Sequence, residues 1–369
     1  MRILLASDKF KGALSAQGVA QASERALQKV FPGAVFDFCP TADGGEGTTE
    51  AMVTALQGTW RETMVLDAHG RPQLARFGWV ADRKLAIMEM SSASGLALLG
   101  DRPLAPHLAS TFGTGEMLLA AQALGAQKII IGIGGSATND GGLGVAVALG
   151  WKFFQADGRN FQPTLVDLLL AVRVERPALA WPELVVACDV DNPLLGPRGA
   201  TQIYGPQKGV QDFAWFERRL AHLAHLAQQA NGYEVQNQPG AGAAGGLGFG
   251  LLAFAGGQLT SGFELVAAQV GLADRIQQAD LVFTGEGRLD DQSLQGKGPL
   301  GVAKLAKQFN KKVVGVAGSV TDTPALHAYF DLLISIKPAE MPLPEAMQRT
   351  AELLEQALIK HTTALRALV

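Results

Sequence analysis

The chain has 369 residues, 48% of them hydrophobic and 18% charged, which is typical of an ordered globular protein with a large core. Its formal net charge of -3, without a dense Lys/Arg stripe, argues against a nucleic-acid partner. No apolar stretch approaches the roughly 18 residues that a membrane-spanning helix needs. Cys39 and Cys188 form no CxxC pair, and the short apolar run at the N-terminus does not fit a signal peptide. We therefore expect a cytoplasmic protein that acts without a membrane.

Short apolar runs recur along the chain, each followed by a polar or glycine-rich loop. Because these runs are apolar on both faces and alternate with helix-like stretches, they predict α/β architecture with largely parallel sheets. Ligands in such sheets bind at the carboxyl ends of the strands. The runs cover residues 3–6, 36–39, 129–132, 184–187, 281–283 and 313–316.

Two segments interrupt this alternation and are predicted to form β-hairpins. The first hairpin turns at residues 69–72, and the second turns at an Asp-Gly pair, residues 157–158. The central region should therefore contain a mixed sheet. Two helices are also predicted, over residues 247–254 and, as an amphipathic helix, over 345–368.

A chain of this length favours two domains. We predict a discontinuous first domain, residues 1–64 and 271–369, and an inserted second α/β domain, residues 65–270. The active site is expected in the cleft between them.

Two glycine-rich loops could bind phosphate groups through backbone N–H groups. One follows the strand at 129–132, and the other opens the helix predicted at 247–254. Each loop taken alone fits a tight turn as well as it fits phosphate binding, but several such loops at one sheet edge favour an anion site. The candidates are Gly134, Gly135, Ser136, Thr138, Gly240, Gly242 and Gly245.

Five acids follow strands in the same way, namely Asp8, Asp43, Asp140, Asp189 and Glu286. A single acid at such a position is more readily explained as a helix cap, and this interpretation fits the one before Gly141 best. Five acids that converge would repel each other without a cation, which suggests Mg²⁺. One of them could then accept a proton from an attacking hydroxyl.

Several cations lie in the same loops. Lys9 and Lys11 follow the first strand, and Lys208 lies between glycines. For Arg198 a surface role is the simpler interpretation. Arg288, two residues after an acid, is predicted to contact a transferring phosphate or a substrate carboxylate.

With these motifs in this order, the chain resembles type I glycerate kinases along nearly its whole length. The departure is Lys9, where the family usually has a small hydroxyl residue. The matching segments are residues 10–16, 42–48, 90–96, 113–116, 131–142, 187–194, 205–209, 240–248, 284–293 and 296–297.

The resemblance implies two α/β domains, one of them Rossmann-like, and ATP and Mg²⁺ as co-substrates. It implies D-glycerate as the acceptor, with transfer to the 2-hydroxyl giving 2-phosphoglycerate. The family's motif positions in this chain are Asp8, Lys11, Asp43, Asp140, Asp189, Lys208, Glu286, Arg288 and Asp290.

This resemblance leads to specific expected roles. Asp189 and Glu286 would hold Mg²⁺ or act as the base, and Asp43 is the other candidate base. Lys11 and Arg288 would neutralise the γ-phosphate or hold the glycerate carboxylate. The glycine-rich loops, with Lys208 and Asp8, would bind the nucleotide.

Three alternatives stay open at this point. Transfer could go to the 3-hydroxyl instead of the 2-hydroxyl. A nicotinamide-dependent hydroxy-acid oxidoreductase would explain the GxGxxA pattern at Gly132, but no acid is suitably placed for the ribose. A non-catalytic sugar-acid sensor would explain the anion-binding loops but not the many acids.

Overall fold

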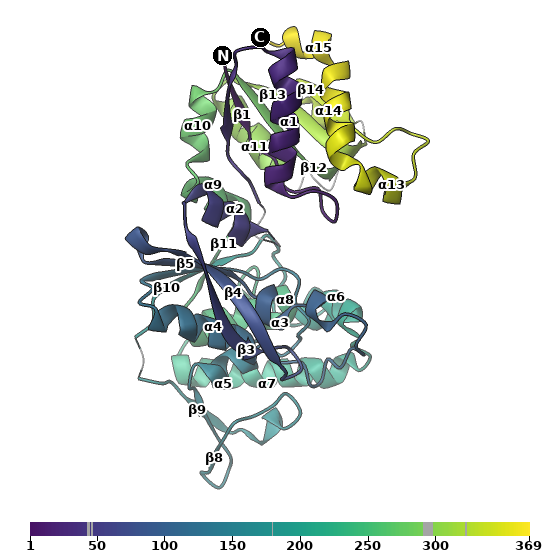
Figure 1. The fold of residues 1–369 in the computed structure, drawn as a ribbon. Coiled ribbons are helices and arrows are strands. Elements are labelled where there is room, and N and C mark those ends of the chain that lie inside the picture. Colours follow the sequence, from purple (N-terminus) through teal and green to yellow (C-terminus); the bar gives the residue numbers. More distant parts are fainter. Residues whose placement is uncertain (43–44, 46, 179, 291–297, 322) are drawn as a thin grey trace. The chain divides into compact units, whose positions relative to one another are not determined.

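The computed structural model divides into two compact units (Figure 1). The parallel-sheet unit comprises residues 1–43, 54–56 and 263–369, and the mixed-sheet unit comprises 44–53 and 57–262. The domain boundary predicted at residue 64 falls inside a strand of the mixed-sheet unit, β3 (Thr59–Leu66). No helix among the described residues is long and apolar enough to cross a membrane. The structure describes residues 1–42, 45, 47–178, 180–290, 298–321 and 323–369.

Five parallel strands form the sheet of the first unit, in the order β14-β13-β12-β1-β2. Counted in chain order within this sheet they run 2-1-3-4-5, a doubly wound order whose switch point lies between β1 and β12. The predicted Rossmann-like parallel sheet is therefore confirmed. The strands are β1 (Arg2–Leu5), β2 (Val35–Phe38), β12 (Leu281–Leu289), β13 (Lys312–Val320) and β14 (Leu332–Ser335).

Helices cover both faces of this sheet (Figure 1). Alternate strand residues such as Ile3, Leu5 and Phe283 share one core with the helices α1 and α14. The other face meets α10 and α11. The helices are α1 (Ala16–Val30), α9 (Gly262–Gln269), α10 (Leu272–Gln278), α11 (Gly298–Gln308), α12 (Pro324–His327), α13 (Leu343–Gln348), α14 (Thr350–Lys360) and α15 (Thr362–Arg366).

The C-terminal helix predicted over residues 345–368 is three helices in the structure. Arg349 and His361 separate them, with φ/ψ of -103°/15° and -92°/16°, outside the helical region. The Thr350 hydroxyl also bonds back to the carbonyl oxygens of Ala346 and Met347, a local bond that competes with a regular helix. The prediction of one helix was wrong, but its packing against the chain's own sheet is confirmed.

Strand β12 continues through a segment that the sequence suggested was a loop. Its pairing with β13 extends to Leu289, which lies opposite Val320. Glycine is required in this pair because a Cβ atom at Gly285 would overlap the carbonyl oxygen of Val316. Gly285 therefore serves close strand packing.

A six-stranded mixed sheet forms the second unit, in the order β11-β10-β6-β5-β4-β3. The strands β5, β6, β10 and β11 are parallel, and the hairpin β3–β4 joins them antiparallel, which confirms the predicted mixed sheet and first hairpin. The other strands of this sheet are β4 (Pro72–Val80), β5 (Leu85–Glu89), β6 (Lys128–Gly132), β10 (Glu183–Ala187) and β11 (Gln258–Thr260).

The second predicted hairpin is also confirmed, as part of a small antiparallel sheet in the order β8-β7-β9.

Helices pack on the larger sheet around one core, in which Met88, Ile131 and Val186 lie. The small strands are β7 (Lys152–Phe154), β8 (Asn160–Phe161) and β9 (Arg173–Glu175). The helices are α2 (Thr48–Ala55), α3 (Ser91–Ser94), α4 (Phe112–Ala123), α5 (Leu143–Ala148), α6 (Ala200–Tyr204), α7 (Phe213–Asn231) and α8 (Ala243–Ala255).

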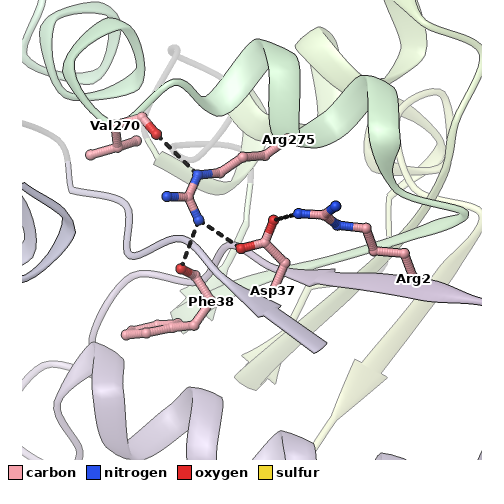
Figure 2. Close-up of polar contacts among 5 residues, drawn as sticks. All are labelled: Arg2, Asp37, Phe38, Val270 and Arg275. Atoms are coloured by element: carbon pink, nitrogen blue, oxygen red, sulfur yellow. Dashed lines mark hydrogen bonds and ion pairs between the residues drawn. The ribbon is translucent and has the colours of Figure 1, made fainter. Parts of the chain in front are cut away.

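One carboxylate links the N-terminal and C-terminal segments of the parallel-sheet unit. Asp37 on β2 lies between two guanidinium groups, at 2.8 Å from Arg2 and 2.6 Å from Arg275 of α10 (Figure 2). Arg275 also donates to the carbonyl oxygens of Phe38 and Val270. Because the Asp37 side chain is only 12% exposed, its removal would leave two guanidinium groups without their shared acceptor.

We expect Asp37→Ala to lower the free energy of unfolding of this unit by about 2–3 kcal/mol, since a hydrogen-bonded charge is lost from a mostly buried site. Urea unfolding followed by far-UV circular dichroism measures this change. All five tryptophans lie between residues 60 and 215, in the other unit, so fluorescence reports that unit separately.

The matched control is Glu355→Ala, which breaks a pair with the half-exposed Arg25 and should cost less than about 1 kcal/mol. Equal stability of Asp37→Ala and the unmodified protein would contradict the assigned role.

Candidate functional site

The switch point of the parallel sheet gathers several predicted residues. The Asp8 N–H donates to the carbonyl oxygen of Gly285 (2.9 Å), which holds the loop after β1 against β12. The backbone of Lys11 lies beside Gly287. The Asp8 carboxylate accepts from the Lys9 N–H (2.6 Å) and lies close to Gly298, the first residue of α11, where the helix dipole favours a negative charge.

Two further candidates come from β12 itself. Glu286 and Arg288 are two residues apart on a strand, so both side chains point to the same face. The Arg288 Nε pairs with Asp290 at 2.9 Å, while the Arg288 side chain stays 68% exposed. The structure therefore places an acid and an exposed guanidinium beside the loop that carries Asp8. Asp43, the other predicted acid of this unit, lies outside the described residues.

In the mixed-sheet unit, the loops after β5 and β6 are joined by backbone hydrogen bonds. The N–H groups of Met90, Leu96 and Ala137 bond across them at 2.8–2.9 Å. At the apex of the β6 loop, Gly134 and Gly135 are exposed, and Gly135 has a φ of +75° that favours glycine. This apex fits the predicted phosphate-binding loop.

The two predicted hydroxyl residues of this loop turn inward. The Ser136 Oγ accepts from the Thr138 N–H and bonds the carbonyl oxygen of Ala244, both at 3.1 Å. Ser136 is 6% exposed and Thr138 is fully buried. In this structure both hydroxyls support the conformation of the loop from its buried side.

The second glycine-rich segment has no exposed apex of the same kind. Gly240, Gly242 and Gly245 are buried, and the Gly242 N–H donates to the carbonyl oxygen of Asn192 (2.8 Å). A Cβ at Gly245 would overlap the carbonyl oxygen of Thr138. Their phosphate-binding role stays a prediction, but close backbone packing alone explains glycine at these positions. The helix predicted over 247–254 is confirmed as part of α8.

Lys208 is the most unusual charged residue of the unit, because its side chain is only 2% exposed. Its Nζ donates to the Thr138 carbonyl oxygen at 2.5 Å and to the Ser136 Oγ at 3.2 Å. Burial lowers the pKa of Lys208 to about 7, although the negative charge of Asp140 acts to raise it.

Asp140 is a helix cap, as the simpler interpretation predicted. Its carboxylate accepts from the backbone and hydroxyl of Thr111 (both 2.8 Å) and from the N–H groups of Gly142 and Gly144 (both 3.1 Å) at the start of α5. Burial raises the pKa of Asp140 above its usual value, although these hydrogen bonds act to lower it.

Asp189 is exposed and is the second residue after β10, which ends at Ala187. Its Oδ1 accepts from the Gly262 N–H (2.8 Å) at the start of α9.

Glu89, at the carboxyl end of β5, is a further acid at a strand end that was not predicted from the sequence. It accepts from the N–H groups of Gly47 and Thr49 (3.0 and 2.9 Å) at the start of α2. Its place directly after the apolar residues 85–88 was the available signal.

The buried Lys208 gives a pH prediction. Between about pH 7 and 10.5 the folded state holds Lys208 neutral while the unfolded state binds a proton, so stability rises with pH in this range. We expect the stability of the unmodified protein relative to Lys208→Met to increase from pH 7 to pH 10, by at most about 1.4 kcal/mol per pH unit. Urea unfolding of both proteins measures the difference, and a difference that stays constant over this pH range would contradict the lowered pKa of Lys208.

Comparisons with known proteins agree along the whole chain. The model of the "Glycerate kinase family" matches residues 3–366. A glycerate kinase of Bacillus subtilis (strain 168) is 43% identical over 364 residues, covering 96% of this chain and 95% of the relative. A glycerate 2-kinase of Escherichia coli (strain K12) is 44% identical over 348 residues, covering 91% of each chain.

A solved structure is similar over the same length. The crystal structure of a protein assigned as glycerate kinase 2, from Salmonella typhimurium LT2, matches with a TM-score of 0.89 and 37% identity, covering 100% of this chain and 98% of that one. With a family model that spans nearly every residue and relatives above 40% identity, this chain belongs to the glycerate kinase family.

Proposed function

We propose that this protein transfers the γ-phosphoryl group of ATP to the 2-hydroxyl of D-glycerate, with Mg²⁺ as the metal. The observation that carries this proposal is the 44% identity over 348 residues to a relative named glycerate 2-kinase. The exposed glycine apex and the acids at strand ends support it, because phosphoryl transfer depends on positioning and on charge stabilisation.

In this proposal, the backbone N–H groups around Gly134 and Gly135 bind phosphate oxygens of ATP. Lys11 and Arg288, both exposed, neutralise the γ-phosphate or hold the glycerate carboxylate. Asp8 supports nucleotide binding from the loop after β1.

The acids fit Mg²⁺ by their chemistry. Among the described residues, no three His, Cys, Asp or Glu side chains gather into a metal site. Mg²⁺ in kinases is usually held by only one or two carboxylates together with phosphate oxygens and water, so one or two acids suffice. Asp189 and Glu286 would hold the ion, which would stabilise the negative charge on the transferring phosphate.

The acceptor hydroxyl must lose a proton as the new P–O bond forms. A carboxylate within hydrogen-bond reach of that hydroxyl can take the proton. The acid that is not bound to the metal, among Asp189, Glu286 and Asp43, would have this role. Asp140 is excluded from it by its burial and its four hydrogen bonds.

The proposed reaction is tested by incubating the purified protein with ATP, Mg²⁺ and D-glycerate. We expect ADP release that requires glycerate, and a phosphorus NMR spectrum of the product that matches 2-phosphoglycerate. A spectrum of 3-phosphoglycerate would reject the 2-hydroxyl as acceptor while keeping the kinase. No glycerate-dependent ADP release would reject the proposed function.

Arg288→Ala should lower kcat/KM by about 100- to 1,000-fold, the usual loss when a group that stabilises transition-state charge is removed. Because the side chain is 68% exposed, the free energy of unfolding should change little. Steady-state kinetics and urea unfolding measure the two effects.

Arg198→Ala is the matched control, since Arg198 is 67% exposed and also pairs with a nearby aspartate, Asp191. It should keep near-normal kinetics. Near-normal turnover of Arg288→Ala as well would remove Arg288 from the proposed site.

A further inference from the structure

The buried amine of Lys208 connects three separate segments of the mixed-sheet unit. The residue ends a short 3₁₀ helix, η4 (Pro206–Lys208), and its side chain crosses the interior to the loop after β6. There its Nζ bonds the carbonyl oxygen of Thr138 and the hydroxyl of Ser136. We call Lys208, Ser136, Thr138 and the turn 244–246 the Lys208 clamp.

The turn 244–246 closes the clamp from the other side. Its three residues have left-handed φ values of 55°, 71° and 86°, and Ala244 is not a glycine, so this conformation needs support from its surroundings. The Ser136 hydroxyl provides a bond to the Ala244 carbonyl oxygen (3.1 Å). Gly245 leaves the space that the amine occupies, since a Cβ there would lie 2.8 Å from Nζ.

The clamp lies on the buried side of the loop whose apex is exposed. Gly134 and Gly135 directly precede Ser136, and they are open to solvent while the clamped residues are not. A side chain that is 2% exposed and already bonded inside the protein is poorly placed to contact a ligand at that apex. The geometry therefore separates the loop's ligand face from its support.

Burying the Lys208 amine costs free energy, which is unusual for a residue with a purely structural role. An ammonium group surrounded by neutral oxygens loses its hydration without a partner of opposite charge in contact. Among the described residues, the hydrogen-bond partners of Nζ are both neutral oxygens, and Asp140 is the titratable group whose charge acts on it. A donor at this position is nevertheless required, because two loop oxygens converge on it.

We propose that Lys208 is a positioning residue, which fixes the loop 134–138 from its buried side so that the N–H groups of the apex face the triphosphate, and that it does not contact the nucleotide. This inference rests on the proposed kinase function for its kinetic consequence. Its structural part, the order of the loop, does not depend on that function.

A double-mutant cycle tests the kinetic part. Lys208→Met and Ser136→Ala should each raise KM for ATP about tenfold and change kcat by less than about threefold, because a misplaced loop weakens nucleotide binding in ground and transition states alike. The double variant should resemble Lys208→Met alone, since both residues act through the same loop. If the double variant instead raises KM for ATP by the product of the two single effects, Lys208 and Ser136 act independently. Lys208 would then act on the nucleotide directly, which would overturn the proposal.

Hydrogen exchange of the protein without nucleotide tests the structural part. In Lys208→Met, backbone amides of residues 134–138 and 244–246 should exchange at least about tenfold faster, while amides of the parallel-sheet unit keep their rates. Ser136→Ala provides the same readout if Lys208→Met does not fold. Unchanged exchange in the folded variant would overturn the proposal.

Lys152→Met on β7 is the matched control, because Lys152 is an exposed lysine of the same unit. It should change neither KM nor exchange. If the unmodified protein phosphorylates glycerate but Lys208→Met keeps its KM for ATP, the positioning role of Lys208 is rejected and the proposed kinase function is retained. If the unmodified protein shows no such activity, the proposed function is rejected. The hydrogen-exchange rates then still test whether Lys208 orders the loop 134–138.

Discussion

The shared direction of parallel strands is the constraint on which the candidate site depends. Strands that pair in parallel end at the same edge of their sheet, so the loops that follow them must be neighbours. In the mixed sheet this brings the loops after β5 and β6 close enough to exchange backbone hydrogen bonds. In the parallel sheet it brings Asp8 beside Gly285, at the switch point between β1 and β12. Each unit thereby brings segments that are far apart in sequence to one edge of its sheet.

Glycine serves two different purposes in these loops. Gly134 and Gly135 are exposed and leave the backbone open to a ligand. Gly242, Gly245 and Gly285 are buried at points where any side chain would overlap a neighbouring carbonyl oxygen. Both uses require the absence of a Cβ atom, so the residue type alone cannot distinguish them. The distinction depends on burial, which only the folded chain reveals.

The sequence predicted the architecture well because periodicity is a local property. The two hairpins, the mixed sheet and the parallel sheet all follow from runs of apolar residues and from the turns that separate them. The prediction failed in two places. A tertiary contact, the pairing with β13, extended β12 across its glycines. Local departures of the backbone at Arg349 and His361 divided the last helix. The burial of Ser136 could not be foreseen either, because its partners come from residues 138, 208 and 244.

The acids at strand ends share one position in the sequence pattern but differ in burial, and burial determines whether a ligand can reach each carboxylate. Asp140, Asp189 and Glu89 each accept hydrogen bonds from the N-terminus of a helix, as the sequence position of such residues favours. Asp140 is 2% exposed and bonded to four donors, so a change of partner would require the core to open. Asp189 is exposed, so water or a ligand can reach its carboxylate without such a rearrangement. The accessible carboxylate of Asp189 can cap a helix and still accept a cation, whereas the four donors to Asp140 already occupy its carboxylate oxygens, and this difference favours Asp189 over Asp140 as a ligand of a magnesium nucleotide.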